Sequence, residues 1–493
     1  MPLQPGDNLN SVPASQKQTL STNYLDLSSA DNAGWGQQYL PDLMEKEAEV
    51  FGPRTISGFL AQVGAEEAMT ADQVIWSEQS RLHLSYKGDM DTDNIVTIQS
   101  DMDGNVAADG FVVANHGIRL NDTVLIANAN GVFKAIVSSI TGPAVTVAPY
   151  NGTAIATSGA TADFGTTILV YGSEFAKGTG YNAAAAATVE SRGANEAAFK
   201  TFTNKPIIMK DYYEVSGSDA SRIGWIETSN EAGGSGYMWY LKAESDTRAR
   251  FNDYIEMSML ESVKGSGTNA VDTLLGGVIA GNDTLVGTQG LFDAIEDRGN
   301  VTTGVTGVNA QTDLAEFDAI LAEFDKQGAI EENMMFVNRA TSLAMDDMLA
   351  SMNGHGTGGT SYGVFDNSED MALNLGFSGF RRGSYDFYKS DFRYLNDLAT
   401  RGGINAANAA NALRGVIVPA GTSTVYDQQL GKNLKRPFLH VRYRASATDD
   451  RRMKSWTTGS VGAATTALDA MQIHMLTERC LITQGANNFM LMK

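Results

Sequence analysis

Six short runs of β-forming residues between Ile95 and Tyr171 constrain the fold of this chain more than any other feature. Turn residues separate the runs, and the pair Asn130-Gly131 predicts a tight hairpin because both residues tolerate positive φ. Closely spaced short strands of this kind predict a compact β-barrel or sandwich. The runs are residues 95–98, 111–113, 124–126, 132–137, 145–147 and 168–171.

Extended segments flank this β-region on both sides. Residues 82–86 alternate strictly between apolar and polar side chains, and residues 202–210 form a second strand able to pair with them. The β-region is therefore interpreted as an insertion, at about residues 92–177, carried by a long two-stranded ribbon. Because such a ribbon is marginally stable in water, we expect it to lie on another surface.

The first 36 residues are polar and aperiodic, which predicts an extended arm. Helices are expected from Leu40 to Phe51 and from Ile56 to Val63. The start of the chain lacks the basic and apolar regions of a signal peptide, and no apolar run reaches the roughly 18 residues of a membrane span. We therefore expect a protein made in a cytoplasm.

A long helix is predicted over residues 231–263, where it would span about 50 Å. It is predicted to have one apolar face and two i,i+4 ion pairs. A polar middle in a helix of this length is typical of a strut exposed on one side. The face is Phe251, Tyr254, Ile255, Met259 and Val263, and the pairs are Glu244–Arg248 and Asp246–Arg250.

An α/β layer is predicted next, after loops and short strands over residues 265–308. It contains a helix over residues 314–324 ended by Gly328, a strand over residues 334–337, and a helix capped by Thr341 or Ser342. That second helix is expected to bury Leu343, Met345, Met348 and Leu349. Later strands are expected at residues 385–388, 416–418, 439–443 and 471–475, before an apolar end at residues 489–492.

Charge and cysteine content exclude several classes of protein. Acidic residues number 57 and basic residues 36, a formal net charge of −21, which argues against nucleic-acid binding and against a polybasic membrane anchor. The hydrophobic content of 43% is typical of a globular protein. Cys480 is the only cysteine, which excludes an internal disulfide and a cysteine-based metal site.

Two glycine-rich motifs resemble catalytic or cofactor loops. Residues 359–363 match the letters of a nucleophile elbow with Ser361 at its centre, but a loop precedes them where that motif needs a strand. Residues 354–359 resemble a dinucleotide loop, but they follow a predicted helix. Both are interpreted as one glycine-rich loop, and no catalytic residue and no cofactor is assigned.

Titratable side chains outside these loops also favour structural roles. The aspartates between Asp89 and Asp103 lack the glycine and glutamate spacing of a calcium loop and are interpreted as a solvated turn, so no metal site is assigned. His440 alternates with Arg442 and Arg444 on a predicted polar strand face, and His474 is placed on a similar face. Cys480 is interpreted as a small buried hydrophobe, with a reactive thiol as the alternative. The aspartates are Asp89, Asp91, Asp93, Asp101 and Asp103.

The order of elements resembles the HK97-type major capsid protein of tailed bacteriophages. Local matches resemble capsid proteins of crAss-like and related phages, and they lie at residues 204–208, 213–217, 223–225 and 237–255. The resemblance implies an α+β, HK97-like fold. Its parts would be an N-terminal arm and helix (1–76), an E-loop ribbon with the inserted β-domain (77–216), a P-domain with spine helix 231–263 (217–308), an A-domain (309–430) and return strands of the P-domain (431–493).

The resemblance also implies a function. The chain would be a non-enzymatic capsid protein that self-assembles as hexamers and pentamers into the icosahedral shell of a virion, around double-stranded DNA that it does not read. Scaffolding, portal and decoration or head-fibre proteins are expected partners, with no membrane and no cofactor. Because the segment of residues 1–76 is short, we expect no maturation cleavage, and no crosslink is predicted.

Two rival functions remain. An encapsulin-like nanocompartment has the same fold and would bind the tail of a cargo enzyme. An acidic hydrolase with a β accessory domain would need facing carboxylates in a cleft, or Ser361 as nucleophile, and the sequence nominates no such carboxylate pair.

Overall fold

The computed structural model describes residues 56, 58–79, 83–91, 93–102, 116–156, 165–178, 199–218, 227–229, 235–265, 287–328, 330–354, 379–427, 432–461 and 464–493. The chain divides into two compact units, one made of residues 1–76 with 202–493 and the other of residues 77–201. The fold is α+β, as predicted. The predicted arm and the helix expected from Leu40 to Phe51 lie outside the described residues.

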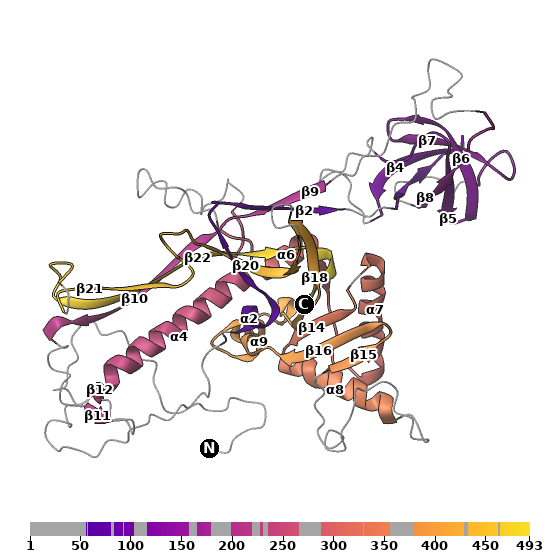
Figure 1. Ribbon diagram of the computed structural model, residues 1–493. Helices are drawn as coiled ribbons and strands as arrows, with labels where there is room; N and C mark the ends of the chain where they lie inside the picture. The colour runs from indigo at the N-terminus through magenta and orange to yellow at the C-terminus, as the bar shows by residue number, and fades with distance from the viewer. Residues whose placement is uncertain are drawn as a thin grey trace. The chain divides into compact units, whose positions relative to one another are not determined.

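The second unit is a closed six-stranded antiparallel barrel, which confirms the predicted β-insertion (Figure 1). Its interior is filled by alternate apolar side chains such as Val96, Ile98, Ile126 and Ile168, all fully buried. This period-2 burial explains why the sequence pattern was readable. In barrel order the strands are β3 (Ser85–Met90), β4 (Ile95–Asp101), β7 (Ala144–Pro149), β6 (Gly131–Thr141), β5 (Asp122–Asn128) and β8 (Thr166–Ser173).

Two details of the barrel differ from the prediction. The β5–β6 hairpin pairs Asn128 with Gly131, so its two-residue turn is Ala129 and Asn130, and Gly131 already begins β6 with φ 140°. The sixth strand of the barrel is β3, because Tyr86 and Met90 point into its core. The predicted strand over residues 111–113 lies outside the described residues.

The ribbon prediction was wrong in its pairing. Residues 202–210 were expected to pair with the strand near Leu82, yet β3 pairs with β4 and β8 inside the barrel. Instead β9 (Phe199–Asn204) pairs with β2 (Val74–Gln79), and β10 (Ile207–Ser216) joins a sheet of the first unit. The Tyr86 side chain is buried in the barrel core. Its strand therefore pairs within the barrel and not with residues 202–210.

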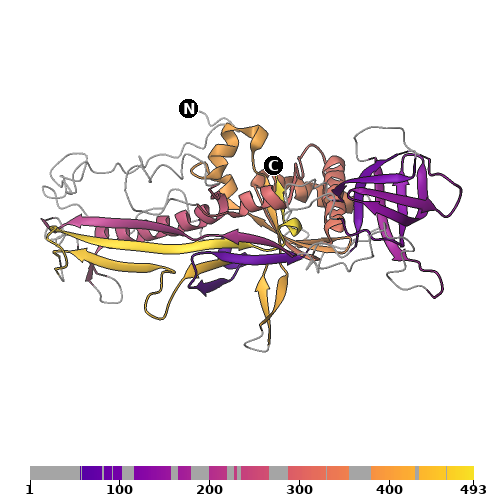
Figure 2. The ribbon, with the colours of Figure 1, turned by 90° about the horizontal axis from the view of Figure 1, so that it is seen from above.

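The first unit contains a five-stranded sheet built around the long strand β22 (Figures 1 and 2). β22 pairs antiparallel with β10 over ten residues and also with β20 and β21, while β1 pairs parallel with β20. The remaining strands of this sheet are β1 (Glu66–Met69), β20 (Leu439–Arg444), β21 (Lys454–Gly459) and β22 (Ala470–Thr483).

Helix α4 (Met238–Glu261) packs along one face of this sheet (Figure 2). It begins later than predicted, because residues Ser235–Tyr237 form β12, which pairs with β11 (Glu227–Ser229), and it therefore spans about 36 Å. Phe251, Ile255 and Met259 are buried as predicted, but Tyr254 and Val263 are exposed.

Of the two ion pairs predicted on α4, one is formed. Arg248 lies 3.0 Å from Glu244, as predicted, whereas Arg250 lies 3.8 Å from Asp211 on β10 instead of pairing with Asp246. Arg250 thus joins the helix to the sheet. The exposed outer side of α4 agrees with the prediction of a strut covered on one side only.

A six-stranded sheet forms the α/β layer, with helices on both faces (Figure 1). Alternate residues of its central strands enter two cores, Phe336 on one side and Met335 on the other, which explains their uninterrupted apolar sequence. The strands, in sheet order, are β13 (Asn300–Thr302), β23 (Met490–Met492), β17 (Gly415–Pro419), β14 (Glu332–Val337), β16 (Tyr385–Asp391) and β15 (Gly379–Arg382).

The helices of this layer agree with the prediction except in two details of α8. α7 (Ala310–Gln327) ends at Gly328 in the left-handed region, as predicted. α8 (Arg339–Gly354) is capped by Asn338, whose Oδ1 accepts from the Thr341 amide at 2.8 Å, instead of by Thr341 or Ser342. Leu343 is exposed on α8, while Met345, Met348 and Leu349 are buried as predicted.

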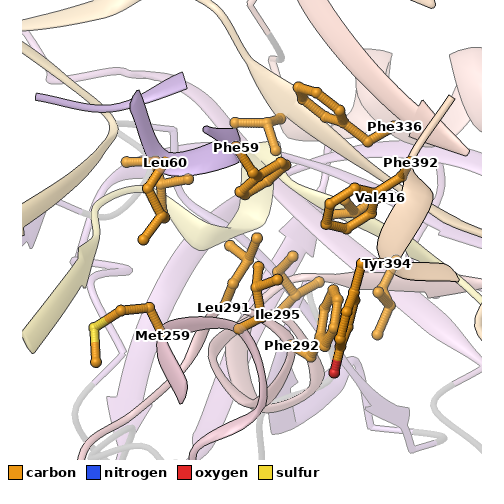
Figure 3. Packing of buried hydrophobic residues seen from close by; sticks show 14 of the residues in the cluster. Phe59, Leu60, Met259, Leu291, Phe292, Ile295, Phe336, Phe392, Tyr394 and Val416 are labelled. Carbon is orange, nitrogen blue, oxygen red and sulfur yellow. The ribbon is translucent and has the colours of Figure 1, made fainter. Parts of the chain in front are cut away.

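A short helix, α6 (Leu291–Arg298), lies where loops and strands were predicted. Its Leu291, Phe292 and Ile295 enter a core with Phe59 of α2 (Phe59–Val63), the second predicted helix (Figure 3). Three rings meet there, with Phe59 lying 4.6 Å from Phe336 and 4.9 Å from Phe392 between centroids. This core joins α2, α6, the five-stranded sheet and the six-stranded sheet.

Smaller elements complete the first unit. A two-stranded hairpin lies beside the larger sheets, and two short helices follow β16 (Figure 1). They are β18 (Thr422–Asp427) with β19 (Lys432–Pro437), and α9 (Arg393–Asn396) with α10 (Arg401–Ala407).

Candidate assembly surface

One face of the five-stranded sheet is covered by helices, and along β10, β22 and β21 no described residue covers the opposite face, called the bare face below. Met209 and Met475 point to the covered face, where they pack with Phe251 and Ile255 of α4. The residues on either side of Met209 in β10 point to the opposite face, and one of them, Ile208, is 53% exposed. Because strand side chains alternate between faces, the bare face can be assigned residue by residue.

A row of three rings crosses the bare face. Tyr212, His474 and Trp456 are direct cross-strand neighbours on β10, β22 and β21. The His474 ring is stacked between the other two, with centroids 6.1 Å from Tyr212 and 5.2 Å from Trp456. Tyr212 is 57% exposed and Trp456 38% exposed, so the row presents flat aromatic surface to solvent.

Polar neighbours hold this row in place. Thr458 Oγ1 lies 2.7 Å from His474 Nε2 and donates to Gln472 Oε1 at 3.2 Å, and Gln472 Nε2 donates to Glu214 at 2.6 Å. These bonds run across the same three strands. The middle ring of the row, His474, is therefore fixed before any partner binds, which lowers the entropic cost of an interface.

Ion pairs link the strands at the other end of the same sheet. Arg442 lies 2.7 Å from Glu67, and Arg444 pairs with Asp72 and lies 3.5 Å from Glu478. His440, Arg442 and Arg444 share one face of β20, as predicted, although His440 on that polar face is only 2% exposed. Its Nδ1 lies 3.2 Å from the Pro437 carbonyl oxygen.

The start of the described chain is held by two carboxylates of α4. Asp253 accepts from the Ile56 amide at 2.8 Å, and Glu256 accepts from the amides of Gly58 and Leu60 at 3.0 and 3.3 Å. Burial raises the pKa of Glu256, and the two amide hydrogen bonds oppose that rise. The segment that leads into the sheet is thus attached to α4 within one molecule.

The chain leaves and re-enters the first unit through the β2–β9 pair. The Arg298 guanidinium at the end of α6 lies over the rings of Trp76 and Phe202, 5.6 and 4.3 Å from their centroids. Both are favourable cation–π contacts. They attach the outgoing strand β2 and the returning strand β9 to α6.

Asn204, the last residue of β9, is the hydrogen-bond centre of this junction. Its amide nitrogen donates to the carbonyl oxygens of Gln289 and Leu481 at 3.0 and 2.6 Å. Its side-chain oxygen accepts from the Thr288 hydroxyl at 3.1 Å and from the Gln289 and Lys205 amides, each at 2.9 Å. Asn204 is 1% exposed, and sequence reasoning included it in a motif without assigning it this role.

Replacing Asn204 with Asp is expected to lower the free energy of unfolding by about 2 kcal/mol, since both donors disappear and two buried carbonyls face a carboxylate. Urea unfolding at neutral pH measures the change. Asn408→Asp, at an exposed position, serves as the control and is expected to stay within about 0.5 kcal/mol of the parent. An equally small change for Asn204→Asp would show that this network is dispensable.

Comparisons with known proteins give matches among solved structures alone. No protein-family model matches the sequence, and no curated protein matches it. A structure described as "Asymmetric unit of bacteriophage PhiM1 mature capsid" matches at 8% identity and TM-score 0.38, covering 92% of this chain and 91% of that one. "Capsid structure of the Cyanophage P-SCSP1u" matches at 7% identity and TM-score 0.37, covering 92% and 93%. The chain is similar to these phage capsid chains over nearly its full length.

A third match is described as "Gordonia phage Cozz", at 10% identity and TM-score 0.37, covering 97% of each chain. The similarity thus extends through both units of this chain.

The structure places the remaining sequence candidates as follows. Ser361 and the glycine-rich residues 355–363 lie outside the described residues, as does Asp103. Asp89 lies in β3 and Asp101 in β4, so their interpretation as part of a solvated turn was wrong, and the Asp89 side chain accepts from the Met90 amide at 2.9 Å. Among the described residues, no group of three or more His, Cys, Asp or Glu side chains is arranged to hold a metal, and no helix is long and apolar enough to cross a membrane.

Cys480 is fully buried beside Met69, Trp76 and Ile482, as its interpretation as a small hydrophobe predicts. Burial raises the pKa of its thiol to about 12, against a smaller opposing effect of Arg442. The thiol therefore stays protonated well above neutral pH.

We expect iodoacetamide to leave Cys480 unmodified at pH 8 in the folded protein and to modify it after denaturation, because the thiolate is the reacting species. Intact-mass spectrometry before and after addition of guanidinium measures this. Rapid modification of the native protein would contradict the burial of this side chain.

Proposed function

We propose that the chain is the major capsid protein of a tailed bacteriophage, which self-assembles into the icosahedral head shell around double-stranded DNA. The observation that carries the proposal is the bare face of the five-stranded sheet. Its ring row is half exposed in a single molecule, although burial of each ring would be favourable by about 25 cal/mol per Å². A second copy of the chain can supply that cover in every subunit of a closed shell.

Named parts of the HK97-type fold follow from this proposal. The arm and helix are residues 1–76, and the E-loop is residues 77–216, which include the barrel. The P-domain is residues 217–308 with α4 as spine helix, together with the return strands 431–493. The packing of Met475 on β22 against Phe251 and Ile255 of α4 supports this return. The A-domain is residues 309–430, which include α7 and α8.

Assembly of identical copies would use closed head-to-tail contacts, which generate rings of six and of five. An acidic inner wall would not bind packaged DNA tightly, since the negative charges of the wall and of the phosphates repel. The barrel would lie on the outer surface, and separate scaffolding, portal and decoration or head-fibre proteins would complete the virion.

The test is the size and content of the purified particle. Light scattering and negative-stain electron microscopy are expected to show closed shells of uniform size, and particles from infected cells are expected to protect DNA from nuclease. Shells that hold a cargo enzyme and no DNA would favour the encapsulin-like alternative. A strictly monomeric protein at high concentration would refute the proposal.

A further inference from the structure

A groove of about 770 Å³ crosses the outside of the six-stranded barrel and has no role in the assembly argument. It is formed by four strands that are neighbours in the barrel, β7, β6, β5 and β8, together with the residues that follow β7 and β8. Its volume lies within the range of about 300–1,000 Å³ that is usual for small-molecule sites. The lining residues used below are Thr123, Lys134, Tyr150, Asn151, Tyr171 and Glu174.

Two tyrosine rings line the groove and remain open to solvent. Tyr150 is 48% exposed and Tyr171 is 53% exposed. The Tyr150 hydroxyl donates to the Glu174 carboxylate, and its amide donates to the Lys134 carbonyl oxygen at 3.0 Å. That hydroxyl bond raises the pKa of Tyr150 to about 12, so it persists at neutral pH. The ring is thus held in place although half of it is in water.

The chemistry of the lining indicates the class of ligand. Among the described residues that line it, only Lys134 and Glu174 are charged, one of each sign, so this lining selects no anion or cation by net charge. Acidic side chains outnumber basic ones across residues 77–201, which further disfavours phosphorylated ligands. Exposed rings beside hydroxyl and amide groups suit a neutral ligand that has apolar faces and a hydroxylated edge.

We propose that this groove binds a neutral saccharide. The apolar face of a sugar ring would stack on Tyr150 or Tyr171, and its hydroxyls would bond to polar groups such as Asn151 and Lys134. The proposal concerns the barrel alone and holds whether or not the chain forms a shell.

Saturation-transfer NMR on the full chain, with titration calorimetry, tests the proposal against a panel of neutral trisaccharides of glucose, mannose, galactose and N-acetylglucosamine. At least one is expected to bind at millimolar concentration. Tyr150→Ala and Tyr171→Ala are each expected to weaken that binding roughly threefold to tenfold, because each removes a stacking ring. Tyr171→Phe keeps the ring and is expected to bind within about twofold of the parent.

Tyr388→Ala is the matched control, since Tyr388 is 47% exposed on β16 outside the barrel, and it is expected to bind like the parent. Circular dichroism checks that each variant is folded. Failure of the whole panel to bind, binding that neither alanine variant weakens, or tighter binding of an anionic probe such as ATP would each overturn the proposal. Binding of a protein partner through these tyrosines, without any sugar, would also overturn it.

Discussion

Replacing both Tyr212 and Trp456 with lysine is expected to abolish particle assembly while leaving the subunit folded. Tyr212 is 57% exposed and Trp456 38% exposed in the single molecule, so the isolated fold is expected to lose little stability. In a shell the same positions would be covered by another copy, and each buried ammonium would cost several kcal/mol. Since every subunit carries both changes, the penalty is repeated at every contact and closed particles disappear.

Electron microscopy and sedimentation velocity measure assembly, and thermal unfolding of the dissociated subunit measures the fold. The matched control is Tyr212→Phe with Trp456→Phe, which keeps flat apolar rings on the same strands and is expected to yield normal particles. Normal particles from the lysine variant would show that this sheet face is not a contact between copies. A lysine variant whose melting temperature falls steeply would mean that the row stabilises the subunit itself.

Elements with an unbroken period were predictable from the sequence. The alternating apolar residues of the barrel and the helical spacing of Phe317, Ile320 and Phe324 in α7 identify both structures, because their burial is periodic. Gly328 marks the end of α7 because its left-handed conformation suits glycine. These are local properties, and the sequence contains them without any knowledge of the neighbours.

Pairing partners were less predictable, because they depend on contacts between distant residues. By their alternation alone, residues 202–210 could pair equally well with residues 82–86 or with β22. Only the barrel core, which buries Tyr86, excludes pairing with residues 82–86. Helix α6 was missed because its eight residues lie in a stretch rich in Gly and Thr. Gly290 and Gly299 on either side of Leu291 and Ile295 were the available signal.

The candidate surface was only partly predictable. The polar side of β22 around His474 could be predicted from alternation. The ring row also depends on the registers of β10 and β21 with β22, which place Tyr212 and Trp456 beside His474. Asn204 gave no signal at all, since a buried amide with five hydrogen bonds looks like any asparagine at a strand end. Such residues are defined by the carbonyls and amides that surround them.

Removing the ammonium of Lys389 is expected to be the most destabilising single change within the α/β layer. Lys389 on β16 pairs with Asp346 on α8, and their side chains are only 5% and 10% exposed. The Lys389 ammonium also donates to the Ser342 carbonyl oxygen at 3.1 Å. Lys389→Met keeps the apolar stem but leaves a buried carboxylate without its cation, which costs about 3–5 kcal/mol of unfolding free energy.

Urea unfolding of the dissociated subunit at neutral pH measures this cost, and two further variants identify its origin. Lys389→Met combined with Asp346→Leu removes both charges and is expected to recover most of the loss, because a buried ion pair is often no more stable than an apolar pair of similar size. Lys326→Met breaks an exposed pair with Glu323 and is expected to cost no more than about 0.5 kcal/mol. If the double variant were as unstable as Lys389→Met alone, lost packing and not the uncompensated charge would account for the effect.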